Sequence, residues 1–301
     1  MTFTLAHLSD VHLAPLPAPR RRELLNKRIT GFINWQRRRH FIHDRPTLNA
    51  LVADVKQRHV DHIAVTGDIT NIALPQEFVE GRRWLDSLGT PKDVTVIPGN
   101  HDAYVPLGLS FAEQEWGPFM HGDAGESFPF VRRRGPLALI GLSSAIATAL
   151  FRATGRVGQE QLATLSPLLD QLKEEGLFRI VLVHHPPISR AGRSKRLIDA
   201  PALMHVIARH GAELLLHGHD HLHMINWLAG PNGSRIPAIG VHSASAAAIT
   251  HPDSAAYHLF EIDGAPDNWH CALISRGLAG DGSVNERLRK VLYAEGRASA
   301  A

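Results

Sequence analysis

Four histidines alternate along the stretch LLLHGHDHLH: His217, His219, His221 and His223. The apolar run before them is typical of a buried β-strand. Because a strand points every second side chain to the same face, a continued strand would bring the four imidazoles to one place. Imidazole nitrogens are common ligands of divalent metals, so the stretch predicts a metal site to which some of these histidines contribute.

Four further motifs follow apolar runs and are rich in metal-binding side chains. They are Asp10-Val11-His12, Gly67-Asp68, Gly99-Asn100-His101-Asp102 and His184-His185-Pro186. Each motif alone is common, since Asp-x-His arises by chance and Gly-Asp often forms a turn. Their recurrence after strand-like runs indicates one shared metal centre, because sites in open α/β sheets form at the carboxyl ends of strands.

The donor set limits both the ions and the reaction. Carboxylates, imidazoles and an amide oxygen suit borderline-hard divalent ions; we expect manganese, with iron, zinc or cobalt as alternatives. No cysteine lies in the motifs, which excludes a thiolate zinc site. Two ions about 3.5–4 Å apart, bridged by one carboxylate, can clamp a phosphate group and activate a water molecule as hydroxide. The motifs therefore predict a divalent metal site, and their donor set is suited to two ions that act on a phosphate ester.

Strand-like and helix-like segments alternate through most of the chain and would position these motifs. Apolar runs begin at Phe3, His62, Asp93, Leu137, Arg179 and Ala212, and helical spacing covers 47–58, 75–88, 158–175 and 200–210. This alternation predicts a layered α/β fold, and more strands from Ile236 to Ser275 indicate a mixed or second sheet. We predict one domain over 1–280, then a C-terminal helix (Asn285–Ala294) and a polar, disordered tail within 281–301.

The composition is that of a globular protein. The chain has 301 residues, 44% of them hydrophobic, and a net charge of only +3. The single cysteine, Cys271, excludes an internal disulfide framework and suits a reducing compartment. No apolar run reaches the ~18 residues of a membrane span, and the N-terminus lacks the features of a signal peptide. We therefore expect a cytoplasmic protein.

The motif order D-x-H, G-D, G-N-H-D, H-H-P and G-H-x-H resembles the calcineurin-like metallophosphoesterases. The resemblance implies a four-layer α/β/β/α sandwich with mixed sheets and a binuclear site at the sheet edge. By position in the motifs, it implies a first ion on Asp10, His12 and His221, a second ion on Asn100, His184 and His219, and Asp68 as the bridge. His101 would bind no metal and would assist the leaving-group oxygen, as a general acid or as a charge stabiliser.

The other polar residues of the motifs have predicted supporting roles. Asp102 would orient His101 and belongs with it to the catalytic residues. His185 points away from its neighbouring ligand in an extended chain, and His217 lies deeper in its strand, so we expect neither to bind metal. His223 falls outside the motif, and a place in the lining of the substrate cleft is one option for it.

A basic, amphipathic segment lies between the first two strands, over about 20–42. From Arg20 to Arg39 it holds eight basic residues and one acidic residue, a local charge of +7. On a helical wheel, one half carries the apolar residues Leu24, Leu25, Ile29, Phe32, Ile33 and Trp35. Arg28 and Arg39 intrude on that half, and Gly31 weakens the helix.

A basic amphipathic helix of this kind predicts peripheral binding to an anionic membrane. The main alternative is an ordinary helix that packs its apolar face on the body of the protein. A nucleic-acid surface is disfavoured, because the rest of the sequence offers no second basic stripe.

The core motifs do not select among phosphate esters, because one metal centre serves many substrates. The strings NKRITGFINWQRRR, VTGDITNIALPQEF and PGNHDAYVP are similar to bacterial phospholipases C of the same family. That resemblance implies a phosphodiesterase that cleaves membrane glycerophospholipids, at the inner face of the cytoplasmic membrane, to diacylglycerol and a phosphorylated head group. The alternative is a soluble phosphodiesterase for 3′,5′-cyclic AMP. An inactive binding scaffold is disfavoured because every ligand position is present. The sequence does not specify an oligomeric state.

Overall fold

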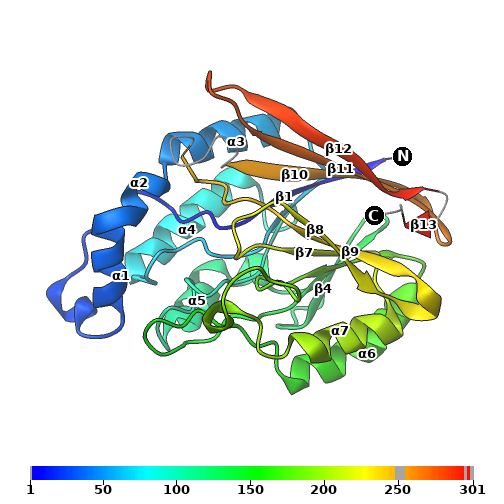
Figure 1. Ribbon diagram of the computed structural model, residues 1–301, viewed down its shortest axis with the longest axis horizontal. Coiled ribbons are helices and arrows are strands. Elements are labelled where there is room, and N and C mark those ends of the chain that lie inside the picture. Colours follow the sequence, from blue (N-terminus) through cyan, green and yellow to red (C-terminus); the bar gives the residue numbers. More distant parts are fainter. Residues whose placement is uncertain (1, 248–254, 295–296, 299–301) are drawn as a thin grey trace.

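Two β-sheets face each other in the computed structural model, which describes residues 2–247, 255–294 and 297–298 (Figure 1). The first sheet has the strand order β13-β12-β11-β10-β1-β2-β3. Its strands are β1 (Phe3–Leu8), β2 (His62–Val65), β3 (Val94–Val96), β10 (Ala256–Ala265), β11 (Asn268–Leu278), β12 (Val284–Ala294) and β13 (Arg297–Ala298). β1, β2 and β3 run parallel, and the neighbouring pairs from β1 to β13 run antiparallel.

The second sheet has the strand order β4-β5-β6-β7-β9-β8. Its strands are β4 (Phe130–Arg134), β5 (Leu137–Gly141), β6 (Phe178–Leu182), β7 (Leu214–His217), β8 (Met224–Ala229) and β9 (Arg235–Gly240). The four central strands are parallel, and the two edge strands are antiparallel to their neighbours. Strands buried on both faces need apolar side chains on both, which is why the runs in the sequence are continuous rather than alternating.

Helices cover the outer face of each sheet. α3 (Arg45–Gln57), α4 (Pro75–Leu88) and α5 (Gly108–Met120) share a core with the first sheet, and α6 (Gln159–Glu174) and α7 (Ala200–His210) share one with the second. A third core lies between the sheets, where Leu5 and Phe260 of the first meet Leu139 and Ile180 of the second. The predicted four-layer α/β/β/α sandwich with mixed sheets is confirmed. None of the described helices is long and apolar enough to span a membrane.

The basic segment forms a series of short helical pieces at the left-hand side of Figure 1, not the single helix predicted. They are a 3-10 helix η1 (Arg21–Leu24), α1 (Arg28–Asn34), a π-helical turn η2 (Trp35–Arg39) and α2 (His40–Ile42). Arg28 turns inward and donates to the carbonyls of Ile72 (3.1 Å) and Ala73 (2.5 Å). Gly31 also faces inward, since a Cβ there would lie 2.6 Å from Ile72 Cγ2.

Trp35 lies on this inward side too and is only 5% exposed. Leu25, Ile29 and Ile33 therefore face outward, with exposed fractions of 85%, 46% and 44%. The predicted apolar half of the wheel is thus divided between the body of the protein and the surface, because the two intruding arginines find polar partners inside.

The C-terminal helix predicted over Asn285–Ala294 is wrong, because these residues form β12. β12 pairs with β11 along almost its whole length, and its Leu292 and Tyr293 enter the core between the sheets. Strand pairing and this burial override the local helical spacing. The domain boundary predicted at 280 falls between these two paired strands. Of the predicted disordered tail, 295–296 and 299–301 lie outside the described residues.

Candidate metal centre

The five motifs meet where β1, β2, β3, β6 and β7 end. Backbone hydrogen bonds join their loops: Asp10 N–H donates to the Gly67 carbonyl (3.0 Å), and Gly218 N–H donates to the His184 carbonyl (3.1 Å). The two sheets are joined here as well, since His219 N–H donates to Asp10 Oδ2 at 3.0 Å. The loops therefore form one hydrogen-bonded unit around the predicted ligands.

The backbone of this unit is strained. Five of the seven predicted ligands have φ between 39° and 70°: Asp10, His12, Asp68, His219 and His221. Such values are rare outside glycine and cluster at functional sites. β7 ends at His217, so the prediction that His219 and His221 share one face of an extended strand is wrong. The left-handed turns direct these two histidines to different groups.

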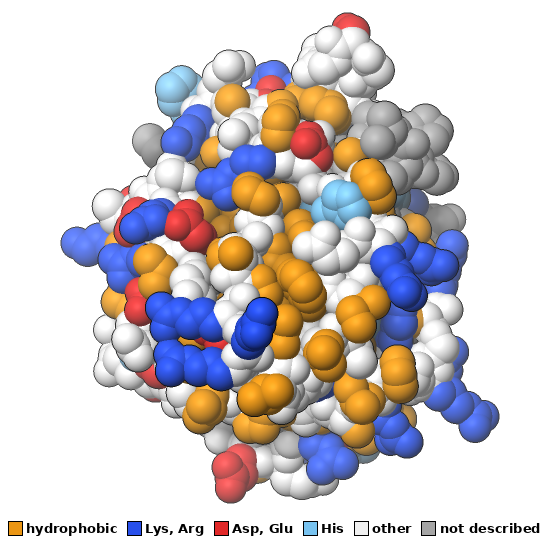
Figure 2. All heavy atoms as spheres, turned by 90° about the vertical axis from the view of Figure 1, so that its left-hand side faces the viewer, with side chains coloured by type: hydrophobic (Ala, Val, Ile, Leu, Met, Phe, Trp, Pro, Cys, Tyr) orange, Lys and Arg blue, Asp and Glu red, His pale blue; other side chains and the backbone are white. Residues whose placement is uncertain are grey.

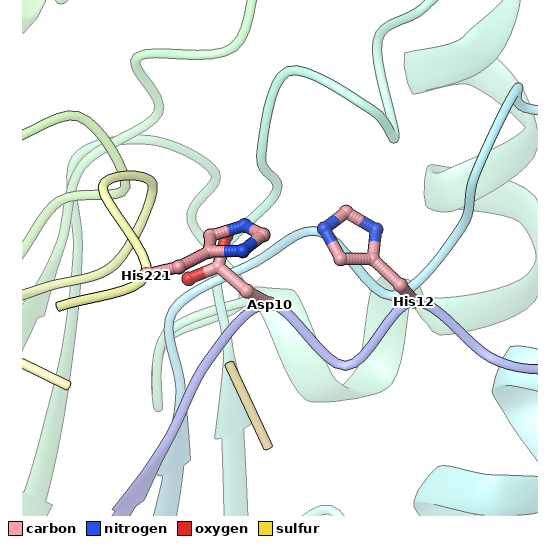
Figure 3. Close-up of side chains that lie close together, drawn as sticks. All are labelled: Asp10, His12 and His221. Carbon is pink, nitrogen blue, oxygen red and sulfur yellow. The ribbon is translucent and has the colours of Figure 1, made fainter. Parts of the chain in front are cut away.

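The first group consists of Asp10, His12 and His221 (Figure 3). Their potential ligand atoms all lie within 4.8 Å of one another, and His221 Nε2 is 3.2 Å from Asp10 Oδ1. Asp10 and His12 are fully buried, whereas the His221 side chain is 36% exposed. His12 Nδ1 donates to the Thr70 carbonyl at 3.0 Å, which leaves the lone pair on Nε2. That nitrogen is buried and has no hydrogen-bond partner among the described residues.

The second group consists of Asp68, His184 and His219, with Asn100 beside them. His184 Nδ1 donates to the Thr66 carbonyl (2.7 Å), and its Nε2 lies 3.3 Å from Asn100 Oδ1. His219 Nε2 donates to the Lys195 carbonyl (2.7 Å), which leaves Nδ1 facing Asn100 Oδ1 at 2.8 Å. Burial lowers the pKa of His219 to about 4, so the ring is neutral and that nitrogen bears a lone pair.

Asp68 lies between the two groups. Its Oδ2 is 3.8 Å from His12 Nε2 and 3.4 Å from His184 Nε2. Burial opposes a charge on this carboxylate, yet the neighbouring imidazoles of His184 and His101 lower the pKa of Asp68 to about 2. Burial equally opposes a charge on His184, but Asp68 and Asp10 raise the pKa of its imidazole to about 9. A cation is therefore favoured beside Asp68, and a metal ion can take the place of that proton.

The residues present fit two divalent ions. A bound cation would satisfy the unpartnered Nε2 of His12 and the facing lone pairs of His219 and Asn100. In each of His12, His184 and His219, the other ring nitrogen donates to a backbone carbonyl. Metal-binding histidines are usually supported in this way. When bound, two such ions supply Lewis acidity to a phosphoryl group and lower the pKa of a water molecule.

His101 lies beside both groups, and the Asn71 carbonyl orients it. Its Nδ1 donates to that carbonyl at 2.5 Å, and its backbone N–H donates to Asp68 Oδ1 at 2.7 Å. Burial and the Arg39 guanidinium lower the pKa of His101 to about 3, so Nε2 carries a lone pair. The Asn71 carbonyl thus orients the His101 ring, a role that was predicted for Asp102.

The prediction that Asp102 orients His101 is wrong. The Asp102 carboxylate instead accepts from the backbone N–H groups of Gly99, Asp68, Ile69 and Thr70 and from the Thr70 hydroxyl. These bonds use its oxygens to hold the Asp68 loop against the Asn100 loop. Asp102 is therefore a structural residue of the centre.

Three other histidines are placed outside both groups, two of them as predicted. His185 bonds to Ser144 Oγ and the Ala153 carbonyl, and His217 to the Gly218 carbonyl. His223 Nδ1 lies 3.1 Å from His258 Nε2.

The centre also contains two residues, His43 and Arg39, that the sequence analysis did not assign to it. His43 packs its ring 4.5 Å from that of His12, stacks on Trp35, and bonds through Nδ1 to Ser245 Oγ at 2.9 Å. Arg39 Nη1 lies 2.8 Å from His101 Nε2. The density of histidine and arginine in RRRHFIH was a signal for both, but the wheel analysis assigned the segment to the surface.

Comparison with known proteins agrees with this geometry. The family model described as calcineurin-like phosphoesterase matches residues 3–223, which include both groups and His101. The chain belongs to the calcineurin-like phosphoesterase family. The family assignment confirms the predicted metal-dependent hydrolase of phosphate esters.

Two curated relatives are both named as phosphodiesterases. A probable cyclic nucleotide phosphodiesterase of Synechococcus is 27% identical over 226 residues, 73% of this chain and 74% of its own. A probable glycerophosphodiester phosphodiesterase of Arcobacter nitrofigilis is 28% identical over 128 residues, 42% of each chain.

Solved structures share the fold at low sequence identity. A dimetal phosphatase from Danio rerio has a TM-score of 0.59 at 14% identity, over 94% of this chain and 98% of its own. A purple acid phosphatase from yellow lupin has a TM-score of 0.61 at 14% identity, over 95% of this chain and 53% of its own.

Proposed function

We propose that this calcineurin-like phosphoesterase is a phosphodiesterase whose substrate is a membrane glycerophospholipid, cut on the glycerol side of the phosphate. Two divalent ions, manganese by preference, are held by Asp10, His12, Asp68, Asn100, His184, His219 and His221. His101 assists the leaving oxygen. The observation that carries the lipid part is an exposed apolar surface, flanked by arginines, beside the metal centre.

We call this surface the docking face and define it by six side chains. They are Leu25, Ile29, Ile33 and Phe41 of the basic segment and Leu150 and Phe151 of the loop after β5, with exposed fractions from 44% to 85%. Lys27 Nζ joins the two parts by donating to Thr148 Oγ1 (2.9 Å) and the Arg152 carbonyl (3.3 Å). Figure 2 shows hydrophobic side chains across the middle of this side of the molecule, with Lys and Arg around them.

The charges around the docking face suit an anionic bilayer. Arg21, Arg22, Arg37 and Arg38 of the same segment are exposed. Each such residue near an anionic leaflet contributes about 1 kcal/mol, and burial of an apolar side chain contributes roughly 1.5–3 kcal/mol. Peripheral attachment needs both electrostatic attraction and apolar burial. The positive charge favours the anionic, cytoplasmic face of the inner membrane.

The docking face also borders the metal centre. Its segment carries Arg39, whose guanidinium contacts His101. A lipid drawn from a bilayer under this face would present its phosphate to the ions while its acyl chains stayed near the apolar side chains.

A cyclic nucleotide is the second candidate substrate. The name of the Synechococcus relative, 27% identical over 226 residues, favours it. Such a substrate is soluble and needs no docking face, so the two candidates differ in what they require of the 20–42 segment.

The test is a side-by-side assay of the manganese-loaded chain. One tube holds phosphatidylcholine vesicles with an anionic lipid, and another holds 3′,5′-cyclic AMP; diacylglycerol and AMP are quantified, with the Asp68→Ala variant as a control for contaminating activity. We expect faster diacylglycerol release. AMP release without lipid cleavage would overturn the lipid proposal in favour of the second candidate.

A further inference from the structure

Arg39 is the one residue of the arginine run 37–39 that turns toward the metal centre. Arg37 and Arg38 are exposed, whereas Arg39 is partly buried and lies at the end of the π-helical turn η2. Such turns are rare and occur often at functional sites. Nη1 donates to His101 Nε2 at 2.8 Å, and Nη2 donates to His43 Nε2 at 3.3 Å.

The partners of Arg39 are poor ones for a cation. Other enclosed arginines meet strong acceptors: Arg179 pairs with Glu213, Arg276 with Asp54, and Arg28 donates to two carbonyls. Within the part of the chain that the structure describes, no ion pair to Arg39 lies within 4 Å, and its buried Nε has no hydrogen-bond partner. The carboxylates of Asp68, Glu77 and Asp10 act on this guanidinium only from beyond 4 Å, so the arrangement favours an anion that arrives from outside and contacts it directly.

The position of Arg39 identifies that anion. His101 lies between Arg39 and Asp68, the carboxylate that faces both ligand groups. A guanidinium presents a planar fork of donors that matches two phosphate oxygens. We propose that Arg39 is a phosphate-binding residue of this centre, which donates to the non-bridging oxygens of the substrate's phosphoryl group.

This assignment gives His101 a free nitrogen when substrate binds. As Nη1 moves its hydrogen bond from His101 Nε2 to a phosphate oxygen, that imidazole nitrogen becomes free to take up a proton from water, which it can then donate to the leaving-group oxygen. The inference rests on the phosphodiesterase part of the proposed function and is independent of the lipid part.

The experiment measures binding of inorganic phosphate to the manganese-loaded full chain by calorimetry. It also measures inhibition by phosphate of the hydrolysis of bis(p-nitrophenyl) phosphate, a small soluble diester. Arg39→Met is compared with Arg38→Met, a matched loss of charge one residue away, and manganese content is determined for each variant. Loss of a charged hydrogen bond should weaken phosphate binding about ten- to a hundredfold in Arg39→Met, and leave Arg38→Met unchanged.

Arg39→Lys keeps the charge without the fork and should give an intermediate affinity. Arg39→Gln, which keeps donors for His101 and His43, replaces Arg39→Met if that variant does not fold. Unchanged phosphate affinity in a neutral variant with full manganese content would overturn the proposal, and so would loss of manganese, since Arg39 would then support the site itself. Lipid enters neither measurement, so a failed lipid assay leaves this result intact.

Discussion

The two regions that surround His101 are built in opposite ways. The strand-end loops bury their charged side chains, hold several in left-handed backbone and are tied together by backbone hydrogen bonds. The 20–42 segment consists of short helical pieces, encloses Arg28 and part of Arg39, and exposes aliphatic side chains. The first region fixes the candidate metal ligands, and the second carries the proposed docking face. Under the proposals above, Arg39 links the two regions, because it belongs to the 20–42 segment and contacts His101.

The largest expected effect is in the strand-end loops. Asp68→Ala removes the carboxylate that faces both groups, so we expect fewer than two metal ions per chain and a loss of activity of at least about a thousandfold. Metal content by mass spectrometry and turnover of a soluble diester check this, with the exposed Asp86→Ala as a control. Full turnover with two ions retained would contradict the bridging position of Asp68.

The second effect concerns pH and the same loops. Because the pKa of His184 is raised to about 9 in the metal-free chain, its ring is protonated at neutral pH and a metal must displace that proton. Metal affinity should therefore rise about tenfold per pH unit from pH 6 to about 9 and level off above it, with about one proton released. Manganese titrations at several pH values, in buffers of different ionisation enthalpy, measure both. An affinity independent of pH would contradict the coupling of His184 to the carboxylates.

The third effect lies in the docking face. Ile29→Ser with Ile33→Ser should weaken binding to anionic vesicles at least about tenfold, because apolar burial is lost, while hydrolysis of a soluble diester stays within about twofold. Vesicle co-sedimentation and the diester assay separate the two. The control is Leu288→Ser with Val291→Ser, an exposed aliphatic pair on β12. Equal losses in both assays would show that the segment is structural.

The smallest effect is electrostatic. Arg37→Gln and Arg38→Gln should each weaken vesicle binding about fivefold at low salt, since each basic residue contributes about 1 kcal/mol, and the difference should shrink as salt is added. Arg209→Gln on α7 is the control. A loss that does not respond to salt would point to packing instead of charge.

The sequence was informative where burial dictates residue type. Strands enclosed on both faces require continuous Val, Ile and Leu, so their positions and the layered architecture were predictable, as were helices such as Pro75–Leu88. The positions of the predicted ligands were predictable as well. Each polar motif follows one of those strands, and parallel strands end at one edge of a sheet, so the motifs lie close together.

The sequence was less informative where tertiary contacts choose between local alternatives. β12 has helical spacing but pairs with β11, and Trp35 lies on the predicted apolar arc but packs against His43. Asp102 lies next to His101 in the chain, yet its carboxylate faces the backbone of the Asp68 loop. The partners of Arg39 could not be found from spacing, because they depend on how the segment folds back over the strand ends.

The ring nitrogens of the metal-centre histidines are oriented by main-chain carbonyls. His12, His184 and His219 donate to the carbonyls of Thr70, Thr66 and Lys195. Every amino acid carries such an acceptor, so substitution at those three positions cannot delete it. In a saturation scan the exposed Lys195 should tolerate many replacements other than proline, whereas Thr66 and Thr70 are buried and their hydroxyls bond to His7 and Asp102. The orientation of these three imidazoles thus depends directly on the path of the main chain, and a shift of the backbone would disturb it even where every side chain is kept.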